Sequence, residues 1–197
     1  MIPEELLRKK GGLVHKYEAG DFIYEENSAV EYYLQIVCGK VKLNNFSEDG
    51  KEFIQHIFDA GQCFGEALLF LNKVYPSNAI SLTDTVILEL PKENFFHLLQ
   101  EYPEFSMEIN RNLAQRLYYK MLMSQNLFSK DPQIRLKVLM EYFKQVHVHD
   151  LAVPYHVPLT RQQLANLTGL RVETVIRTIK MMERAGQLQI KDRKIYY

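Results

Sequence analysis

The sequence predicts an α+β protein of three parts: an N-terminal β-barrel or jelly roll, a long helix, and a C-terminal domain of helices and a hairpin. The spacing of apolar residues changes near Pro91 from strand-like alternation to helical periodicity. Residues 132–197 carry eleven Lys and Arg against five Asp and Glu, a charge of +6, so the rest of this neutral chain carries −6. This division predicts that one domain meets a polyanion, with nucleic acid the first candidate and a membrane surface the second.

Short runs of alternating apolar residues fill the chain from about Lys16 to Leu90 and predict strands. The runs are DFIYEE, YYLQIVCGKVKLNNF, KEFIQHIF and AISLTDTVILEL. Turn residues separate them at a rhythm close to the roughly 8–12 residues of an all-β sandwich or barrel. Asp49 and Gly50, between two runs, are a hairpin signal. We therefore predict a barrel domain over residues 1–98.

A helical stretch follows, KENFFHLLQEYPEFSMEINRNLAQRLYYKMLMSQNLFS. Its apolar residues step by four, which predicts one apolar stripe along a long helix. A partner of similar length would best cover such a stripe, so residues 99–130 are predicted to be a dimerisation helix and hinge. The alternative is an amphipathic helix packed on the core of its own chain. The predicted dimer seam is Ile109, Leu113, Leu117 and Met121.

The C-terminal domain is predicted over residues 131–197. Asp131 can cap a helix whose first turn contains Pro132. Two further helices are predicted, RQQLANLTG after Thr160 and RVETVIRTIKMMERAG, and each ends at a glycine. The segment QLQIKDRKIYY then alternates around a polar turn, as a hairpin does. Helix, short turn, helix and hairpin is the order of a winged helix-turn-helix.

The second helix of this motif carries a face suited to reading bases. Glu173 and Arg177 lie one turn apart near its start, where a major-groove helix reaches base edges. An Arg fork suits guanine O6 and N7, and a carboxylate can accept from cytosine N4. The alternative is an ordinary surface ion pair worth only about 0.5 kcal/mol. A lone carboxylate on a basic face would repel phosphate, which favours base reading, and Arg171 is predicted to touch a base edge or a phosphate.

Other polar residues around the motif are predicted to contact the DNA backbone. Side chains at the start of the first helix, together with its free amides, suit a phosphate. The cations of the hairpin add charge, although a merely solvent-exposed hairpin is the alternative. The predicted phosphate contacts are Thr160, Arg161, Gln162, Thr174, Lys180, Lys191 and Lys194.

These signals in this order, together with FGEALLF followed by YPSNAI, resemble the CRP/FNR family of bacterial transcription factors over essentially the whole chain. The resemblance implies a homodimer whose barrels sense a signal and whose two recognition helices enter successive major grooves of a palindromic promoter site. It implies that Glu173 and Arg177 read the core of a TGA-type half-site. It also implies RNA polymerase as a partner.

The same resemblance implies where an effector would bind. In cyclic-AMP binders of the family, the Gly and Glu of F-G-E hold the ribose and an Arg-Ser pair holds the cyclic phosphate. Here Gly65 and Glu66 match, Ser77 matches the Ser, and Pro76 replaces the Arg. The lost charge-assisted bond would be worth about 1.5–3 kcal/mol, so we do not expect cyclic AMP to bind and predict no cofactor. The candidate pocket is Gly65, Glu66, Ser77, Asn78 and Lys120, although Glu66 could instead stabilise the loop after Gly65.

Several classes of function are not expected. Cys38 and Cys63 are far apart and show no C-x-x-C spacing, and HVHDLAVPYH is interpreted as a loop, so no metal or iron–sulfur site is predicted. An enzyme on the barrel would need clustered histidines and a carboxylate, which the sequence lacks. The chain has no apolar run of membrane-spanning length and no signal peptide, so we expect a cytoplasmic protein without a membrane partner. The alternative function is a small-molecule or cyclic-nucleotide sensing module that acts through a protein partner.

Overall fold

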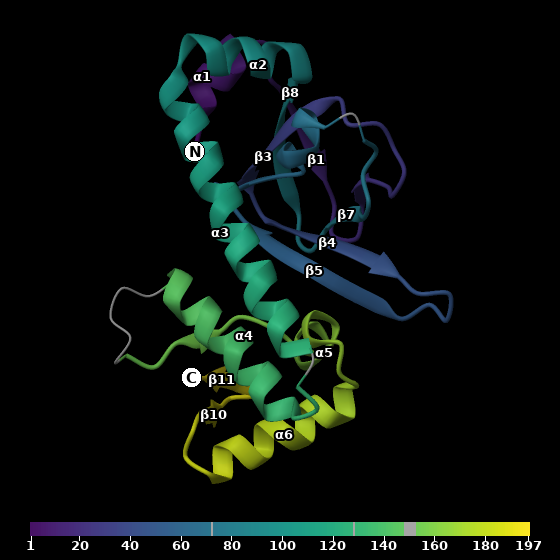
Figure 1. Ribbon diagram of the computed structural model, residues 1–197, viewed down its shortest axis with the longest axis vertical. Coiled ribbons are helices and arrows are strands. Elements are labelled where there is room, and N and C mark those ends of the chain that lie inside the picture. Colours follow the sequence, from purple (N-terminus) through teal and green to yellow (C-terminus); the bar gives the residue numbers. More distant parts are fainter. Residues whose placement is uncertain (72, 128, 148–152) are drawn as a thin grey trace. The chain divides into compact units, whose positions relative to one another are not determined.

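The computed structural model describes residues 1–71, 73–127, 129–147 and 153–197. The chain forms two compact units, Met1–Ala114 and Gln115–Tyr197. The boundary between them falls inside the long helix α3 (Pro103–Leu127), which Figure 1 shows in teal and green.

The first unit contains the predicted barrel and extends beyond residue 98 into α3. It contains two four-stranded antiparallel sheets, with strand orders β1-β8-β3-β6 and β2-β7-β4-β5. The two sheets together form the barrel (Figure 1). The strands are β1 (Leu13–Tyr17), β2 (Phe22–Tyr24), β3 (Tyr32–Cys38), β4 (Lys40–Phe46), β5 (Glu52–Asp59), β6 (Cys63–Phe64), β7 (Asn78–Ser81) and β8 (Thr85–Pro91). Its helical elements are α1 (Glu4–Lys9), the 3-10 helix η1 (Glu66–Phe70) and α2 (Lys92–Glu101).

The barrel core lies between the two sheets. Leu34, Ile36 and Ile87 from one sheet pack in one buried cluster with Val41 and Phe58 from the other. The predicted hairpin at Asp49 and Gly50 is present between β4 and β5. Both sheets therefore direct one face of alternating apolar side chains inward, as the sequence pattern predicted.

A second core cluster joins the helices of this unit to the barrel. Tyr33 on β3 stacks on Phe95 of α2 with ring centroids 4.6 Å apart, and both side chains are fully buried. Leu7 of α1 and Ile109 of α3 belong to the same cluster, and Leu113 packs against it. The first half of α3 is therefore part of the core of its own barrel.

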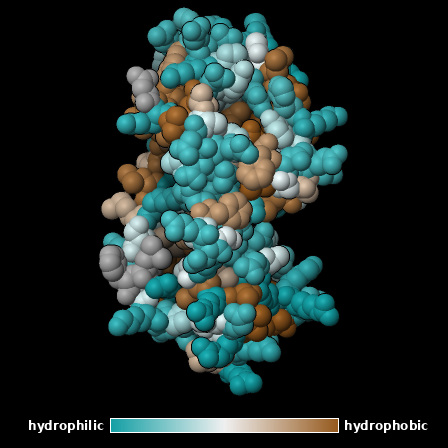
Figure 2. All heavy atoms as spheres, turned by 90° about the vertical axis from the view of Figure 1, so that its right-hand side faces the viewer, coloured by the Kyte–Doolittle hydropathy of each residue, from teal (hydrophilic) through white to brown (hydrophobic). Residues whose placement is uncertain are grey.

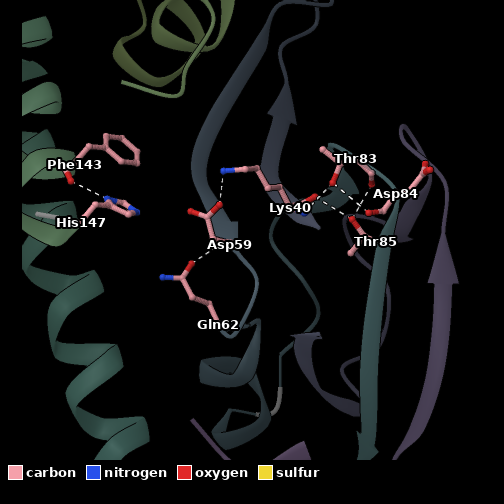
Figure 3. Close-up of polar contacts among 8 residues, drawn as sticks. All are labelled: Lys40, Asp59, Gln62, Thr83, Asp84, Thr85, Phe143 and His147. Carbon is pink, nitrogen blue, oxygen red and sulfur yellow. Dashed lines mark hydrogen bonds and ion pairs between the residues drawn. The ribbon is translucent and has the colours of Figure 1, made fainter. Parts of the chain in front are cut away.

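The turn between β3 and β4 is fixed by hydrogen bonds across the barrel (Figure 3). The Lys40 amide donates to Thr83 Oγ1 at 3.1 Å, and the Lys40 carbonyl accepts from Thr85 Oγ1 at 3.3 Å. The Lys40 ammonium forms an ion pair with Asp59 on β5. Gly39 has φ +93°, and a Cβ there would lie 2.5 Å from the Asp84 carbonyl oxygen, so the turn requires glycine.

The helical segment after Pro91 is divided in two, a break that the periodicity did not predict. α2 ends at Glu101 and α3 begins at Pro103. Between them Tyr102 has φ −128° and ψ 77°, outside the helical region. A residue that precedes proline is disfavoured in the α conformation because its amide and Cβ meet the proline ring.

The second unit has the order of a winged helix-turn-helix. Its elements after α3 are α4 (Pro132–His147), β9 (His156–Val157), α5 (Arg161–Thr168), α6 (Val172–Arg184), β10 (Gln189–Lys191) and β11 (Lys194–Tyr196). Strands β10 and β11 form the predicted hairpin, called the wing below, and β9 pairs with β11. Strand β9 lies at the end of a segment that was predicted to be a loop. A strand of two residues is too short to show the alternation by which strands are predicted.

A shared core holds the helices of the second unit together. Leu164 and Leu167 of α5, and Val175 and Ile179 of α6, are all buried, and the two helices are in contact. On α3, Tyr119 is 2% exposed and packs on Tyr142 of α4, with ring centroids 4.4 Å apart. At the end of α4, His147 Nδ1 lies 2.7 Å from the Phe143 carbonyl oxygen (Figure 3).

Local capping groups mark the ends of the helices in this unit, and among them the Asp131 cap and the end at Gly169 were predicted. The Gln133 amide donates to Asp131 Oδ1 at 2.8 Å at the start of α4. At the start of α5, Thr160 and Gln163 form a complete capping box. Gly169 ends α5 in the left-handed conformation, with φ +68°. The caps at Thr160 and Gly169 set where α5 begins and ends, and so set the short turn that leads into α6.

The face shown in Figure 2 is mostly hydrophilic, and its hydrophobic residues form interrupted patches. Scattered apolar residues are normal on a protein surface. Two helices carry exposed large hydrophobic side chains that bear on function. They are Met107, Leu117, Tyr118 and Met121 on α3, and Ile176 and Met181 on α6.

Candidate nucleic-acid interface

The side of α6 that faces away from the core carries the predicted base-reading pair. Val175, Thr178, Ile179 and Met182 are buried and orient the helix. The opposite side, called the outward face below, lines a shallow depression of about 560 Å³. Its residues are Glu173, Ile176, Arg177, Lys180, Met181 and Arg184. Helix amphipathicity alone thus places both members of the pair on one accessible surface.

Glu173 and Arg177 are exposed and one helical turn apart. In the described part of the chain, the ion pairs at this spacing join Arg8 to Glu4 and Lys137 to Glu141, and none joins Glu173 to Arg177. The two side chains are therefore available to a ligand rather than engaged with each other.

The start of α6 adds positive potential to this surface. Arg171 is the N-cap residue, is exposed, and makes no side-chain capping hydrogen bond. The free amides of the first turn carry the positive end of the helix dipole. Thr174, in the first turn, is half-buried, so its hydroxyl is less accessible than the flanking charged groups.

A basic groove of about 710 Å³ lies between the start of α5, α6 and the wing. It brings together four of the predicted phosphate residues, Thr160, Arg161, Lys180 and Lys194, and adds Arg193. Burial lowers the pKa of the Arg161 guanidinium, and nearby Glu183 opposes this shift. An arginine nevertheless stays charged at neutral pH, so the groove presents four cations from three elements to a polyanion.

The three remaining predicted phosphate residues, Gln162, Thr174 and Lys191, do not line this groove. Gln162 Nε2 donates to Asn166 Oδ1 at 2.9 Å, which draws its side chain along α5. Lys191 is exposed at the end of β10. Thr160 Oγ1 accepts from the Gln163 amide at 3.1 Å and keeps its own proton for donation.

A contact that sequence reasoning missed holds the wing to α6. Glu183 Oε1 accepts from the Ile190 amide at 3.2 Å. The spacing of seven residues across a helix end and a turn carries no recognisable signal. This bond fixes the wall of the basic groove that carries Arg193 and Lys194.

The candidate effector site in the barrel is crowded by aromatic rings. Gly65 precedes η1 with φ +73°, and a Cβ there would lie 3.0 Å from Tyr75 Cε1. Tyr75 stacks on Tyr24 with ring centroids 3.5 Å apart and an interplanar angle of 8°. Glu66, the next residue, is completely buried. The stacked tyrosines thus lie directly against the glycine that the family resemblance assigns to ribose.

Of the other residues of that site, Ser77 and Asn78 belong to the barrel and Lys120 does not. Ser77 and Asn78 are buried, and Asn78 Oδ1 accepts from the Glu26 amide at 2.9 Å. Pro76 is exposed, and its carbonyl accepts from Asn45 Nδ2 at 2.8 Å. Lys120 lies on the part of α3 that belongs to the second unit.

The electrostatic environment of Tyr75 is acidic. Burial raises the pKa of the Tyr75 phenol, and Glu89, Glu31 and Glu66 raise it further.

The predicted dimer seam is divided by the structure. Ile109 is 3% exposed and belongs to the core of its own unit, whereas Leu113 is partly buried against that core. Leu117 and Met121 are 62% and 55% exposed. A strict step of four drifts around a helix of about 3.6 residues per turn, which carries the stripe from the core to the surface.

Among the residues described, no group of three or more His, Cys, Asp and Glu could hold a metal ion, and His149 lies outside them. The helices of the described ranges include none that combines the length and apolarity needed to cross a bilayer.

Both halves of the chain match known domain families. Residues 14–102 match the cyclic nucleotide-binding domain, and residues 136–196 match the Crp-like helix-turn-helix domain. The chain is 32% identical over 174 residues to the cAMP-activated global transcriptional regulator CRP of Haemophilus influenzae, covering 86% of this chain and 77% of that relative.

Solved structures share the fold. The c-di-GMP responsive global regulator CLP of Xanthomonas campestris superposes with a TM-score of 0.77 at 18% identity, covering 98% of both chains. FixK2 of Bradyrhizobium japonicum superposes with a TM-score of 0.78 at 20% identity, covering 94% of this chain and 91% of that one. At these identities the similarity concerns the fold.

Proposed function

The chain belongs to the CRP/FNR family of DNA-binding transcriptional regulators, which are not enzymes, and we propose that it acts in the cytoplasm as a homodimer on a palindromic promoter site. The observation that carries this proposal is the outward face of α6, where Glu173 and Arg177 stand exposed beside the basic groove. In this role α6 enters the major groove, Glu173, Arg177 and Arg171 read base edges, and the groove cations neutralise phosphates. RNA polymerase is the protein partner that the family implies.

The exposed apolar side chains of α3 support the homodimer. Met107, Leu117, Tyr118 and Met121 are each more than half exposed. The four residues are separated by ten, one and three positions, and these spacings place them on one side of the helix. Packing their side chains against a second copy of the chain would remove apolar area from water. This seam keeps Leu117 and Met121 of the predicted stripe and replaces Ile109 and Leu113.

We further propose that the barrel senses an effector other than cyclic AMP. The Haemophilus influenzae relative is cAMP-activated and the Xanthomonas campestris protein is c-di-GMP responsive, so similar chains respond to different ligands. Here Pro76 supplies no positive charge, and the Tyr24–Tyr75 stack and neighbouring acidic residues oppose a phosphate next to Gly65. Glu66 then serves the barrel fold.

Two arginine variants separate base reading from phosphate binding. Arg177→Ala should weaken binding to a selected duplex by about 1–3 kcal/mol and relax specificity at one base pair. Arg161→Ala should weaken all duplexes similarly and reduce the salt dependence by about one phosphate contact. Fluorescence anisotropy on selected and scrambled duplexes measures both effects.

Equal losses on both duplexes for both variants would refute base reading by Arg177. No binding of the unaltered protein to any duplex at low salt would instead favour a sensing module that acts through a protein partner.

A further inference from the structure

We propose that Ile176 is a specificity-determining residue that recognises the methyl group of a thymine, an inference that rests on the proposed binding of DNA by α6. Ile176 is 41% exposed, whereas Val175 and Ile179 on the same helix are fully buried and Val172, at its first position, is half-buried. It lies in the depression of the outward face, between Glu173 and Lys180 along the helix. An isolated exposed isoleucine would carry no meaning, but this one stands among the residues proposed to meet bases.

The position of Ile176 on α6 sets what it can touch. It follows Glu173 by three residues and precedes Lys180 by four, so it shares one side of the helix with both. Arg177 is its direct neighbour in the sequence. When Glu173 and Arg177 contact base edges, the side chain of Ile176 is enclosed between the helix and the same groove.

The chemistry of the major groove leaves one feature that suits this side chain. Base edges there present hydrogen-bond donors and acceptors, to which an isoleucine offers nothing. The exception is the 5-methyl group of thymine, which apolar side chains contact. Burying Ile176 against any other base edge would desolvate a polar atom without giving it a partner, which disfavours those bases.

The stiffness of the side chain makes it a selective probe. A β-branched residue in a helix has essentially one χ1 rotamer, so Ile176 is held in place before DNA arrives. The longer Met181, 52% exposed on the same face, has more freedom and is less suited to discriminate one base.

The test compares thymine with deoxyuridine, which lacks only the methyl group. A duplex is first obtained by random-site selection with the full chain. Each thymine, together with its symmetry mate in an inverted repeat, is then replaced by deoxyuridine, and the affinities of the unaltered protein and of Ile176→Ala are measured.

Ile134→Ala is the matched control, because Ile134 is 43% exposed on α4 of the same unit. Both substitutions replace an exposed helical residue by a stronger helix former, so both variants should fold, which thermal unfolding verifies.

At one thymine, deoxyuridine should weaken binding of the unaltered protein and of Ile134→Ala by about fourfold per half-site, the value of one buried methyl group. The same replacement should leave the affinity of Ile176→Ala nearly unchanged. Equal losses for Ile176→Ala and the unaltered protein at every thymine would overturn the inference while leaving DNA recognition intact. Failure to select any duplex would instead overturn the proposed function itself.

Discussion

Two residues at the tip of the wing have backbone conformations that their side chains disfavour. Asp192 and Arg193 have φ +49° and φ +64°, as the two central positions of a tight hairpin with Lys191 opposite Lys194. Such turns favour Asn-Gly or Asp-Gly, since a left-handed conformation costs most other residues about 1–2 kcal/mol. Asp192 fits this preference and Arg193 does not. The arginine places a cation in the basic groove at the expense of stability.

Arg193→Gly should therefore stabilise the protein and weaken DNA binding at once. Removing the left-handed strain should raise the free energy of unfolding by up to about 1 kcal/mol, partly offset by the greater freedom of glycine in the unfolded chain. Removing the cation should reduce the salt dependence of DNA binding by about one phosphate contact. Urea unfolding and anisotropy titrations at several salt concentrations measure the two effects. A variant that is less stable, with an unchanged salt dependence, would show that Arg193 serves the fold.

Residue-scale features were predictable where their cause is local. Asp131 caps the helix that follows it, as predicted, because a cap depends on a few neighbouring residues. The Tyr24–Tyr75 stack was not predictable, because it joins residues fifty-one positions apart that only the barrel brings together. The exposure of Ile176 was not predicted, because an apolar residue beside Val175 in the sequence is normally assigned to the core.

At the scale of elements, α3 contributes both to the core of the barrel and to the exposed surface. Its first half packs against the barrel through Ile109 and exposes Met107, and its second half exposes Leu117 and Met121. The helical period predicted the helix and its apolar character. It could not predict which apolar residues face the barrel, because that depends on the break at Pro103 and on the packing of α2.

The dimer seam proposed on α3 is tested by Leu117→Glu. Leu117 is 62% exposed, so a charge there costs the isolated chain little, whereas two copies facing each other would bury a carboxylate. Sedimentation velocity should show a dimer for the unaltered protein and a monomer for the variant, with a weaker affinity for the selected duplex. The control is Ile134→Glu, which changes an exposed residue in the first turns of α4, where an acid is tolerated. A variant that remains dimeric would exclude this part of α3 from the interface.

At the scale of the whole molecule, the uneven division of charge was the first indication of function. The net charge of zero hides a basic C-terminal third, and the structure gathers four of its cations in one groove of the second unit. The barrel shows the limit of the same approach. The order of strands and turns predicted the class of the barrel, because many residues contribute to that pattern. The choice of effector depends on a few side chains of the pocket, such as Pro76, Tyr24 and Tyr75, and these form no pattern along the sequence.

Random-site selection with the purified full chain, with and without cyclic AMP, tests the central claim most directly. We predict enrichment of an inverted repeat whose half-site centres lie about 10–10.5 base pairs apart, bound by two chains, with or without cyclic AMP. Enrichment of no sequence, of a single half-site without its repeat, or of a site that appears only when cyclic AMP is present would contradict the account.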